Sequence, residues 1–215
     1  MSCQHYFNII VSRTQTKFAS CIRHFGNMTY NHTSVYLDDD VNNIYAFARP
    51  EHFSIFKGTL VKESLDRFTL RRNQPVPVKV LRFEITEEQY SEIQAIIYNI
   101  YNDPEYIYNL FSVISYPITK GFDTYKAYSC IEFSMTLLKK LGYQFEKPIP
   151  RYKPDDLIEM FKDNIYKSCD IRDLIHEDAG SADYFSPISL SLLASNAVGL
   201  FTIIKRTLFF RNYSH

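Results

Sequence analysis

The chain has 215 residues, which suits one ordinary globular domain with a tail, and its 24 basic and 24 acidic side chains give a formal net charge of zero. Hydrophobic residues make up 46% and charged residues 22%, so the chain can bury a sizeable core and is not a disordered protein. The balanced charge argues against nucleic-acid binding as the main task, because affinity for phosphates needs clustered basic side chains.

The first part of the chain is expected to be mostly β-structure. Alternating and β-branched residues predict strands, and the acidic and amide residues from 38 to 43 predict a hairpin turn. A loop that contains Pro50 and Gly58 is expected before the last of these strands. The predicted strands are residues 7–13, 32–38, 44–49 and 76–85, and a short helix is predicted for residues 16–26.

Helices are expected to follow. Thr86 and Gln89 form a capping-box pattern that opens the first one, and Asp103 before Pro104 stops it. A second helix is predicted over residues 104–115, ending before Pro117. Further segments in this part are a helix over 130–141, a helical turn over 154–161 and a last strand over 164–171. Strands at both ends with helices clustered between them indicate the α+β class.

The helix that begins at Cys130 carries the strongest local signal. Ser129 and Glu132 form an S-x-x-E capping box, which makes Cys130 the first helical residue. A helix N-terminus stabilises a thiolate over a thiol, so Cys130 is a candidate nucleophile, although the nearby Glu132 carboxylate works against a second negative charge. The competing interpretation is a small buried hydrophobe, because free cysteine is among the most buried residue types.

A thiolate needs a base, and His32 is the best-placed histidine because it opens a predicted strand. His52 and His176 are expected to face solvent, and His215 is terminal. The cysteines form no C-x-x-C pair, and the lone Cys3/His5 and Cys21/His24 pairs lack the second ligand pair of a zinc site. We therefore expect no metal and no cofactor. With no basic and apolar leader at the start, reduced thiols in the cytoplasm are expected.

Four short motifs occur in an order that resembles a known family. These are NHTSVYLDDDVNNIYAFAR (31–49), FKGTLVKES (56–64), YSCIEFSMTLLKKLG (128–142) and KPDDL (153–157). Together they resemble the circularly permuted papain-like thiol hydrolases of the NlpC superfamily. The closest likeness is to the YiiX-like bacterial branch, whose relatives include lecithin retinol acyltransferase. The resemblance covers about residues 6–175 and implies an antiparallel sheet packed against the helix that carries the cysteine.

The resemblance implies that Cys130 is the nucleophile and His32 its base. Related enzymes place a third polar residue on the return strand to orient the imidazole, and the matching position here is Ala46, which cannot do so. Tyr45 would serve if the register shifted by one residue. Glu63 matches a glutamate of the family and is the other candidate, with a structural salt bridge as its alternative role.

These observations predict a permuted papain-like domain over residues 1–175 and a C-terminal tail over residues 176–215. The predicted function is a cysteine hydrolase or acyltransferase that acts on a peptide, amide or lipid-acyl substrate through a thioester. A non-catalytic binding or structural module on the same fold is the first alternative. The second is a membrane-associated lipid acyl hydrolase or transferase anchored by the uncharged segment 185–204, which we otherwise expect to be buried or to form an oligomer. The sequence does not indicate the substrate or the oligomeric state.

Overall fold

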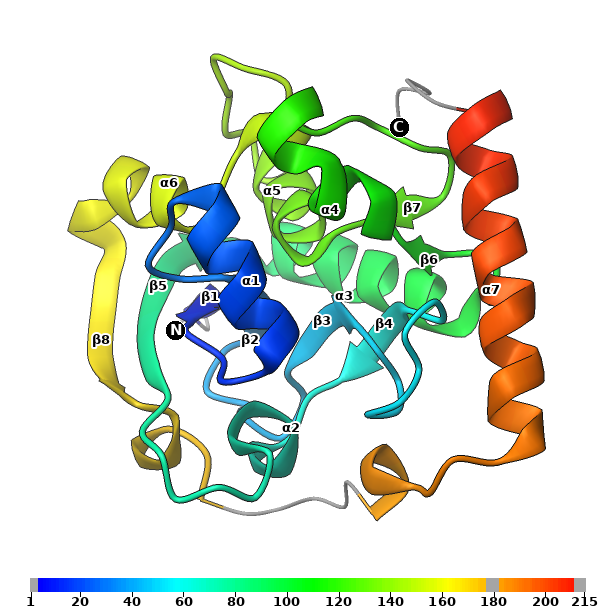
Figure 1. The fold of residues 1–215 in the computed structure, drawn as a ribbon. Coiled ribbons are helices and arrows are strands. Elements are labelled where there is room, and N and C mark those ends of the chain that lie inside the picture. The colour runs from blue at the N-terminus through cyan, green and yellow to red at the C-terminus, as the bar shows by residue number, and fades with distance from the viewer. Residues whose placement is uncertain (1–3, 177–181, 211–215) are drawn as a thin grey trace.

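A single antiparallel sheet organises the chain in the computed structural model, which describes residues 4–176 and 182–210 (Figure 1). The six strands lie in the order β4-β3-β2-β1-β5-β8, and every neighbouring pair is antiparallel. They are β1 (His5–Ser12), β2 (His32–Leu37), β3 (Tyr45–Ala48), β4 (Thr59–Lys62), β5 (Pro77–Ile85) and β8 (Ile165–Asp170). The chain therefore has the α+β class that its sequence predicts.

Helices and short turns cover both faces of the sheet. The helices are α1 (Lys17–Gly26), α2 (Leu65–Thr69), α3 (Glu87–Asn102), α4 (Leu110–Thr119), α5 (Cys130–Lys140), α6 (Pro154–Met160) and α7 (Leu190–Phe209). On one face, α5 contacts β2 and β3, and its side chains share a core with Val35 and Phe47. On the other face, Phe68 of α2 packs with Tyr36 and Ile44. The central strands are thus buried on both sides.

Capping hydrogen bonds begin α3 and α5 at the residues that the sequence predicts. Thr86 accepts a hydrogen bond from the Gln89 amide (3.2 Å), and the Gln89 side chain accepts one from the Thr86 amide (3.0 Å). The predicted capping box at the start of α3 is therefore confirmed. Gly142 follows α5 with φ +98°, a left-handed conformation that glycine adopts without strain.

Two segments differ from the sequence prediction. The expected loop after β3 contains β4, which pairs with β3, and α2, where the Ser64 hydroxyl accepts a hydrogen bond from the Arg67 amide (3.4 Å). The predicted helix over 104–115 starts later, at Leu110, because residues 107–108 instead form β6, which pairs in parallel with β7 (Ala127–Tyr128). Helix α4 also continues through Pro117 to Thr119. The proline removes only its own amide donor, and the Lys120 amide still donates to the Tyr116 carbonyl (2.9 Å).

Helix α7 lies along one side of the domain and docks through a single face (Figure 1). Leu192 and Ile203 are buried, and the Asn196 side chain accepts a hydrogen bond from the Phe56 amide (3.0 Å). Gly199 is so close to this loop that an added Cβ would lie 2.4 Å from the Phe56 carbonyl oxygen. Most other apolar side chains of α7 face outward, so the expectation of a buried segment is wrong for most of this helix. By length and composition, α7 is the one helix among residues 4–176 and 182–210 that could cross a membrane.

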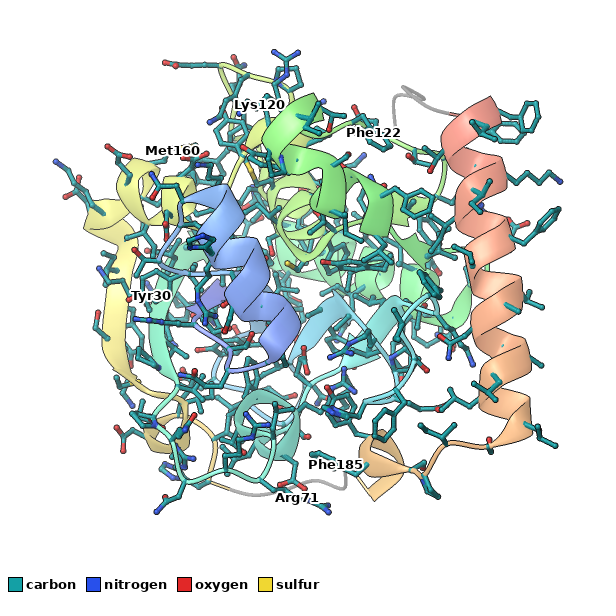
Figure 2. All side chains as sticks on the ribbon, viewed as in Figure 1. Tyr30, Arg71, Lys120, Phe122, Met160 and Phe185 are labelled. Carbon is teal, nitrogen blue, oxygen red and sulfur yellow. The ribbon has the colours of Figure 1, made fainter. Side chains whose placement is uncertain are left out.

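The turn before α7 packs against α2. The Arg67 guanidinium lies 4.4 Å from the Tyr184 ring centroid, and the Arg71 guanidinium lies 4.4 Å from that of Phe185. Figure 2 shows Arg71 beside Phe185 at the edge of the molecule. Cation–π contacts of this kind attach the C-terminal segment to the domain on the side away from α5.

Candidate active site

Cys130 is the first residue of α5 and is 5% exposed. Ser129 accepts a hydrogen bond from the Glu132 amide (3.3 Å), and the Glu132 carboxylate accepts one from the Ser129 amide. The predicted capping box is therefore confirmed, and the thiol lies at the positive end of the helix. Burial raises the pKa of Glu132 to about 7 against the effect of these hydrogen bonds, so the carboxyl group is largely protonated below neutral pH.

Strand β2 brings His32 to this thiol. The Ser134 hydroxyl of α5 donates to the Thr33 hydroxyl of β2 (3.0 Å), which ties the helix to the strand one residue from His32. The Cys130 sulfur lies close enough to the His32 imidazole and to Thr33 for both residues to lower the pKa of the thiol, against the effect of burial. Residues from the start of one strand and the start of one helix thus meet at the same end of the sheet.

The carboxylate of Glu63 is buried next to His32. The Nε2 atom of His32 lies 2.9 Å from Oε1 of Glu63, and Oε2 of Glu63 accepts a hydrogen bond from Nε of Arg67 (2.7 Å). Arg67 also donates to the carbonyl oxygens of Arg49 (2.7 Å) and Pro50 (3.0 Å), so its position is fixed by the loop after β3. Because Glu63 occupies Nε2, Nδ1 is the ring nitrogen that remains for the sulfur.

Each of these groups favours the ionised form of its neighbour. Burial raises the pKa of Cys130, but the charge and hydrogen bond of His32, together with Thr33, outweigh burial and lower it. Burial lowers the pKa of His32, but the charge of Cys130 and the hydrogen bonds of Cys130 and Glu63 raise it to about 10. Glu63, buried beside Arg67 and His32, has its pKa lowered to about 2. The favoured state is a thiolate–imidazolium pair backed by a carboxylate.

The structure brings Glu63 to His32 and places Tyr45 elsewhere. Val35 pairs with Tyr45 and Ala46 pairs with Val61, so alternation along the strands puts Ala46 and Glu63 on the face of His32. Tyr45 projects to the opposite face, where its ring lies 5.6 Å from that of Tyr101. Glu63, which directly follows the neighbouring strand β4, therefore lies on the same face as position 46.

Tyr108 is a site residue that the sequence does not single out. It lies in β6, whose parallel pairing with β7 places Tyr108 beside Tyr128, two residues before Cys130. Its side chain is buried near Cys130, and burial followed by the charge of Cys130 raises the pKa of Tyr108 well above its usual value. The phenol therefore stays protonated and can donate a hydrogen bond. In the sequence it is one of several tyrosines at helical spacing, which points to a core role.

Other candidates lie away from this group. His176 is exposed, as expected, but His52 is partly buried among Phe53, Tyr184 and Phe185, so the expectation that it faces solvent is wrong. Cys169 lies in β8, and burial raises its pKa. Cys3, His215 and the side chain of Cys21 lie outside the described residues. Within the described ranges, no group of three or more histidine, cysteine or acidic side chains is arranged to hold a metal ion.

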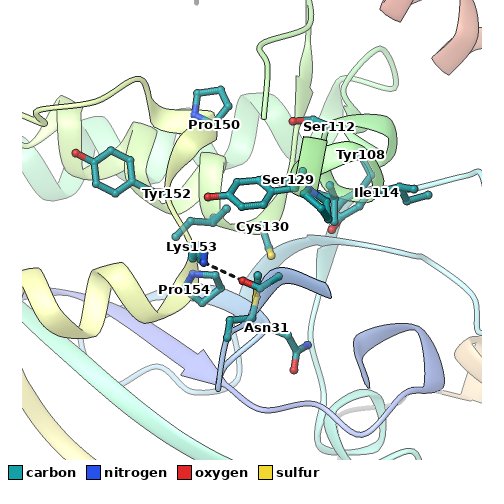
Figure 3. A pocket seen from close by; sticks show the side chains of 16 residues that line it. Asn31, Tyr108, Ser112, Ile114, Ser129, Cys130, Pro150, Tyr152, Lys153 and Pro154 are labelled. Atoms are coloured by element: carbon teal, nitrogen blue, oxygen red, sulfur yellow. Dashed lines mark hydrogen bonds between the residues drawn. The ribbon is translucent and has the colours of Figure 1, made fainter. Parts of the chain in front are cut away.

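Two clefts open on either side of the Cys130–His32 pair. The first has a volume of about 380 Å³, contains Cys130 and is walled mainly by apolar side chains of α4 and of the segment before α6 (Figure 3). The second has a volume of about 690 Å³ and contains His32 and Glu63. Asn31, Tyr108 and Ile114 line both clefts and so form the wall between them.

Comparisons with protein families, curated proteins and solved structures found no match to this chain.

Proposed function

We propose that the protein is a cysteine hydrolase or acyltransferase that cleaves an amide or ester bond through a thioester on Cys130. The observation that supports this proposal is the continuous set of contacts from Cys130 through His32 to Glu63 and Arg67 at one end of the sheet. Nucleophile, base and orienting group in this relation are the minimal machinery of thiol-based acyl transfer.

The geometry suggests a role for each group. The Cys130 thiolate attacks the substrate carbonyl carbon, and the Tyr108 hydroxyl and the amides at the start of α5 donate hydrogen bonds to the developing oxyanion. His32 then gives its proton to the leaving amine or alcohol as the carbon–heteroatom bond breaks, leaving a thioester. Next, His32 accepts a proton from water or from an acceptor alcohol or amine, which attacks the thioester and restores the thiolate. Glu63 holds the ring so that Nδ1 faces the sulfur.

We further propose that the domain is a circularly permuted papain-like fold of the NlpC type and that it works in the reducing cytoplasm. The fold proposal rests on the chain order, in which the histidine strand β2 precedes the cysteine helix α5, and on the packing of α5 against β2 and β3. The free thiols of Cys130 and Cys169 support the proposed compartment. The non-catalytic alternative rests mainly on Ala46, and the contact between Glu63 and His32 weakens it.

Selective alkylation tests the proposed nucleophile. The native protein is treated with iodoacetamide from pH 5 to pH 9, and the modified cysteines are mapped by peptide mass spectrometry. We expect Cys130 to react faster than Cys169 below pH 7, because the pKa of Cys130 is lowered and that of Cys169 is raised. His32→Ala should remove this advantage. If Cys130 in the native protein reacts no faster than Cys169 below pH 7, the proposed function is wrong.

A second candidate function is a membrane-associated acyl hydrolase or acyltransferase that uses the same thiol on a lipid. The observation in its favour is the outer face of α7, where Val198, Phe201 and Phe209 are 67%, 70% and 74% exposed. Soluble proteins rarely leave such a row of large apolar side chains uncovered. The chemistry at Cys130 would be unchanged, and only the source of the substrate would differ.

A further inference from the structure

The cleft beside His32 is unusually rich in arginine. Arg49, Arg67 and Arg72 line it, and Glu63 is the one carboxylate among its lining residues. Arg67 is already paired with Glu63 (2.7 Å). Arg49 and Arg72 take part in no ion pair with any described residue; Arg49 donates instead to the carbonyl oxygen of His52 (2.9 Å). Two cationic groups thus border the cleft without a carboxylate partner in the described part of the chain.

The remaining charges of the site do not compensate these arginines. When the thiolate–imidazolium pair has formed, the charges of Cys130 and His32 cancel, as do those of Glu63 and Arg67. Both Arg49 and Arg72 lie close enough to His52 to lower the pKa of its imidazole further, after the larger effect of burial. His52 therefore stays neutral at physiological pH, and its Nδ1 atom is buried without a hydrogen-bond partner in the described part of the chain.

The division of the site into two clefts assigns the two halves of a substrate. The acyl group becomes attached to Cys130, so it must occupy the apolar cleft that contains this residue. The leaving group must lie within reach of His32, which protonates it, so it must occupy the other cleft. Arg49 is also close enough to Tyr108 to act on the charge of its hydroxyl, which places this arginine near the wall between the clefts.

We propose that the cleft beside His32 is an anion subsite, in which Arg49 and Arg72 bind a carboxylate or phosphate group on the leaving half of the substrate. The substrate class is then an amide or ester with an apolar acyl half and an anionic leaving half. This inference rests on the proposed function, since it takes Cys130 as the nucleophile and His32 as the acid.

A charge series of alkylating reagents tests the subsite without knowledge of the substrate. Iodoacetamides that carry a carboxymethyl, an ethyl or an aminoethyl group on the amide nitrogen share one electrophile and differ mainly in the charge of the arm. We expect Cys130 to react fastest with the anionic reagent, by roughly threefold to tenfold over the neutral one, the scale of one or two solvent-exposed charge pairs. The alkylation rates of Cys169 in the same molecule give the intrinsic order of reactivity of the three reagents.

Variants of single arginines test which side chains cause the preference of Cys130 for the anionic reagent. Arg72→Gln should lower the ratio of the anionic to the neutral rate at Cys130 toward the ratio at Cys169, and the variant should fold normally because Arg72 is exposed. Arg49→Gln should do the same, with thermal stability measured alongside because a hydrogen bond to His52 is lost. Arg71→Gln is the control, since Arg71 pairs with Asp66 (2.6 Å) and does not line the cleft. The preference should also disappear at about 1 M salt, where the screening length is about 3 Å.

The outcomes separate the two proposals. Rapid neutral alkylation of Cys130 with no anionic preference, or with a preference that persists in both Arg49→Gln and Arg72→Gln, overturns the anion subsite and leaves the thiol enzyme standing. Neutral alkylation of Cys130 no faster than that of Cys169 below pH 7 overturns the proposed function, and the subsite falls with it. To identify the source of the anion, inorganic phosphate and acetate are compared as competitors of the anionic reagent. Stronger protection by phosphate indicates a phosphate-bearing leaving group, and equal protection indicates a carboxylate.

Discussion

At the scale of single residues, the buried Glu63 carboxylate raises the pKa of His32 against the effect of burial, and its effect comes after the larger one of Cys130. Its oxygens are shared between His32 (2.9 Å) and Arg67 (2.7 Å), and the side chain is 5% exposed. A carboxylate in this position favours the imidazolium, and the imidazolium in turn favours the thiolate of Cys130. The reactivity of the thiol should therefore depend on a residue that does not touch it.

Replacing Glu63 with glutamine tests this dependence. Glu63→Gln keeps the shape of the side chain and removes its charge, so alkylation of Cys130 at pH 6 should slow roughly tenfold, the effect of about one pKa unit on the thiol. Tyr45→Phe is the matched control, because Tyr45 projects to the opposite face of the sheet. Rates are measured with iodoacetamide over the same pH range in all three proteins. A slower rate in Tyr45→Phe with an unchanged rate in Glu63→Gln would assign the orienting role to Tyr45.

The same carboxylate should affect stability at low pH. The pKa of Glu63 is lowered to about 2 in the folded protein, whereas an unfolded glutamate titrates near 4.3. The unfolded state therefore binds the proton first, and the stability that Glu63 contributes is complete above about pH 4.3 and is lost as the pH falls toward about 2. The difference in melting temperature between wild type and Glu63→Gln should accordingly narrow from pH 6 to pH 3. A constant difference over this range would contradict the lowered pKa.

The sequence predicts a site residue well when nearby residues in the chain determine its position, and poorly when distant contacts do. The position of Cys130 follows from Ser129 and Glu132 alone, and the structure shows the same capping box. His32 is suggested by its place at the start of a strand, but its contact with the thiol depends on the packing of α5 against β2. Glu63 is suggested by the resemblance, and its advantage over Tyr45 depends on the register between β3 and β4. Tyr108 depends on a two-residue parallel pairing, for which the sequence carries no distinct signal.

At the scale of secondary-structure elements, the capping boxes of α3 and α5 are of the same type but lie in different settings. One opens α3 at Thr86 on the exposed side of the helix, and the other opens α5 at Ser129, which is buried. The long helices with these signals begin where the sequence predicts. Strand β4, helix α2 and strand β6 are short and have no periodic pattern of their own, so their neighbours determine them and the sequence prediction misses them.

The two capping boxes provide a matched pair of variants. Thr86→Ala and Ser129→Ala should each lower the free energy of unfolding by about 1 kcal/mol, measured by urea denaturation. Only Ser129→Ala should also slow the alkylation of Cys130, by roughly threefold, because it loosens the helix end that stabilises the thiolate. If Thr86→Ala slows alkylation as much as Ser129→Ala does, the effect reflects general destabilisation, and the capping box at α5 has no specific part in activating the thiol.

At the scale of the whole molecule, α7 presents a surface that the rest of the domain does not cover. Its inner face is fixed by Asn196 and Gly199, and its outer face carries exposed apolar side chains. The helix contains no acidic residue and carries the exposed Lys205 near its C-terminal end, whereas Arg206 faces the domain and donates to the carbonyl oxygens of Tyr125 (3.1 Å) and Lys126 (3.0 Å). This combination is typical of helices that lie in the interface of an anionic bilayer, with the apolar face inserted.

Vesicle sedimentation tests membrane contact through α7. The protein should pellet with phosphatidylserine-containing vesicles, and Phe201→Glu should abolish pelleting without lowering thermal stability, because Phe201 is 70% exposed. Tyr98→Glu on α3 is the control, an aromatic side chain of similar exposure at 68%. Failure of the wild-type protein to pellet would remove the membrane-associated function. Equal loss in both variants would show that added negative charge, and not the face of α7, is responsible.

The order of the site residues along the chain has a consequence for synthesis. His32, Glu63 and Arg67 leave the ribosome well before Cys130, and at about 5–20 residues per second the delay is several seconds. Until α5 has packed on β2, the Cys130 thiol should have an ordinary pKa near 8.5. A thiol that reacts at pH 6 can exist only after the domain has closed. A pulse of iodoacetamide at this pH during refolding would therefore label Cys130 in molecules that have completed the last packing step, and would leave those still in earlier states unmodified.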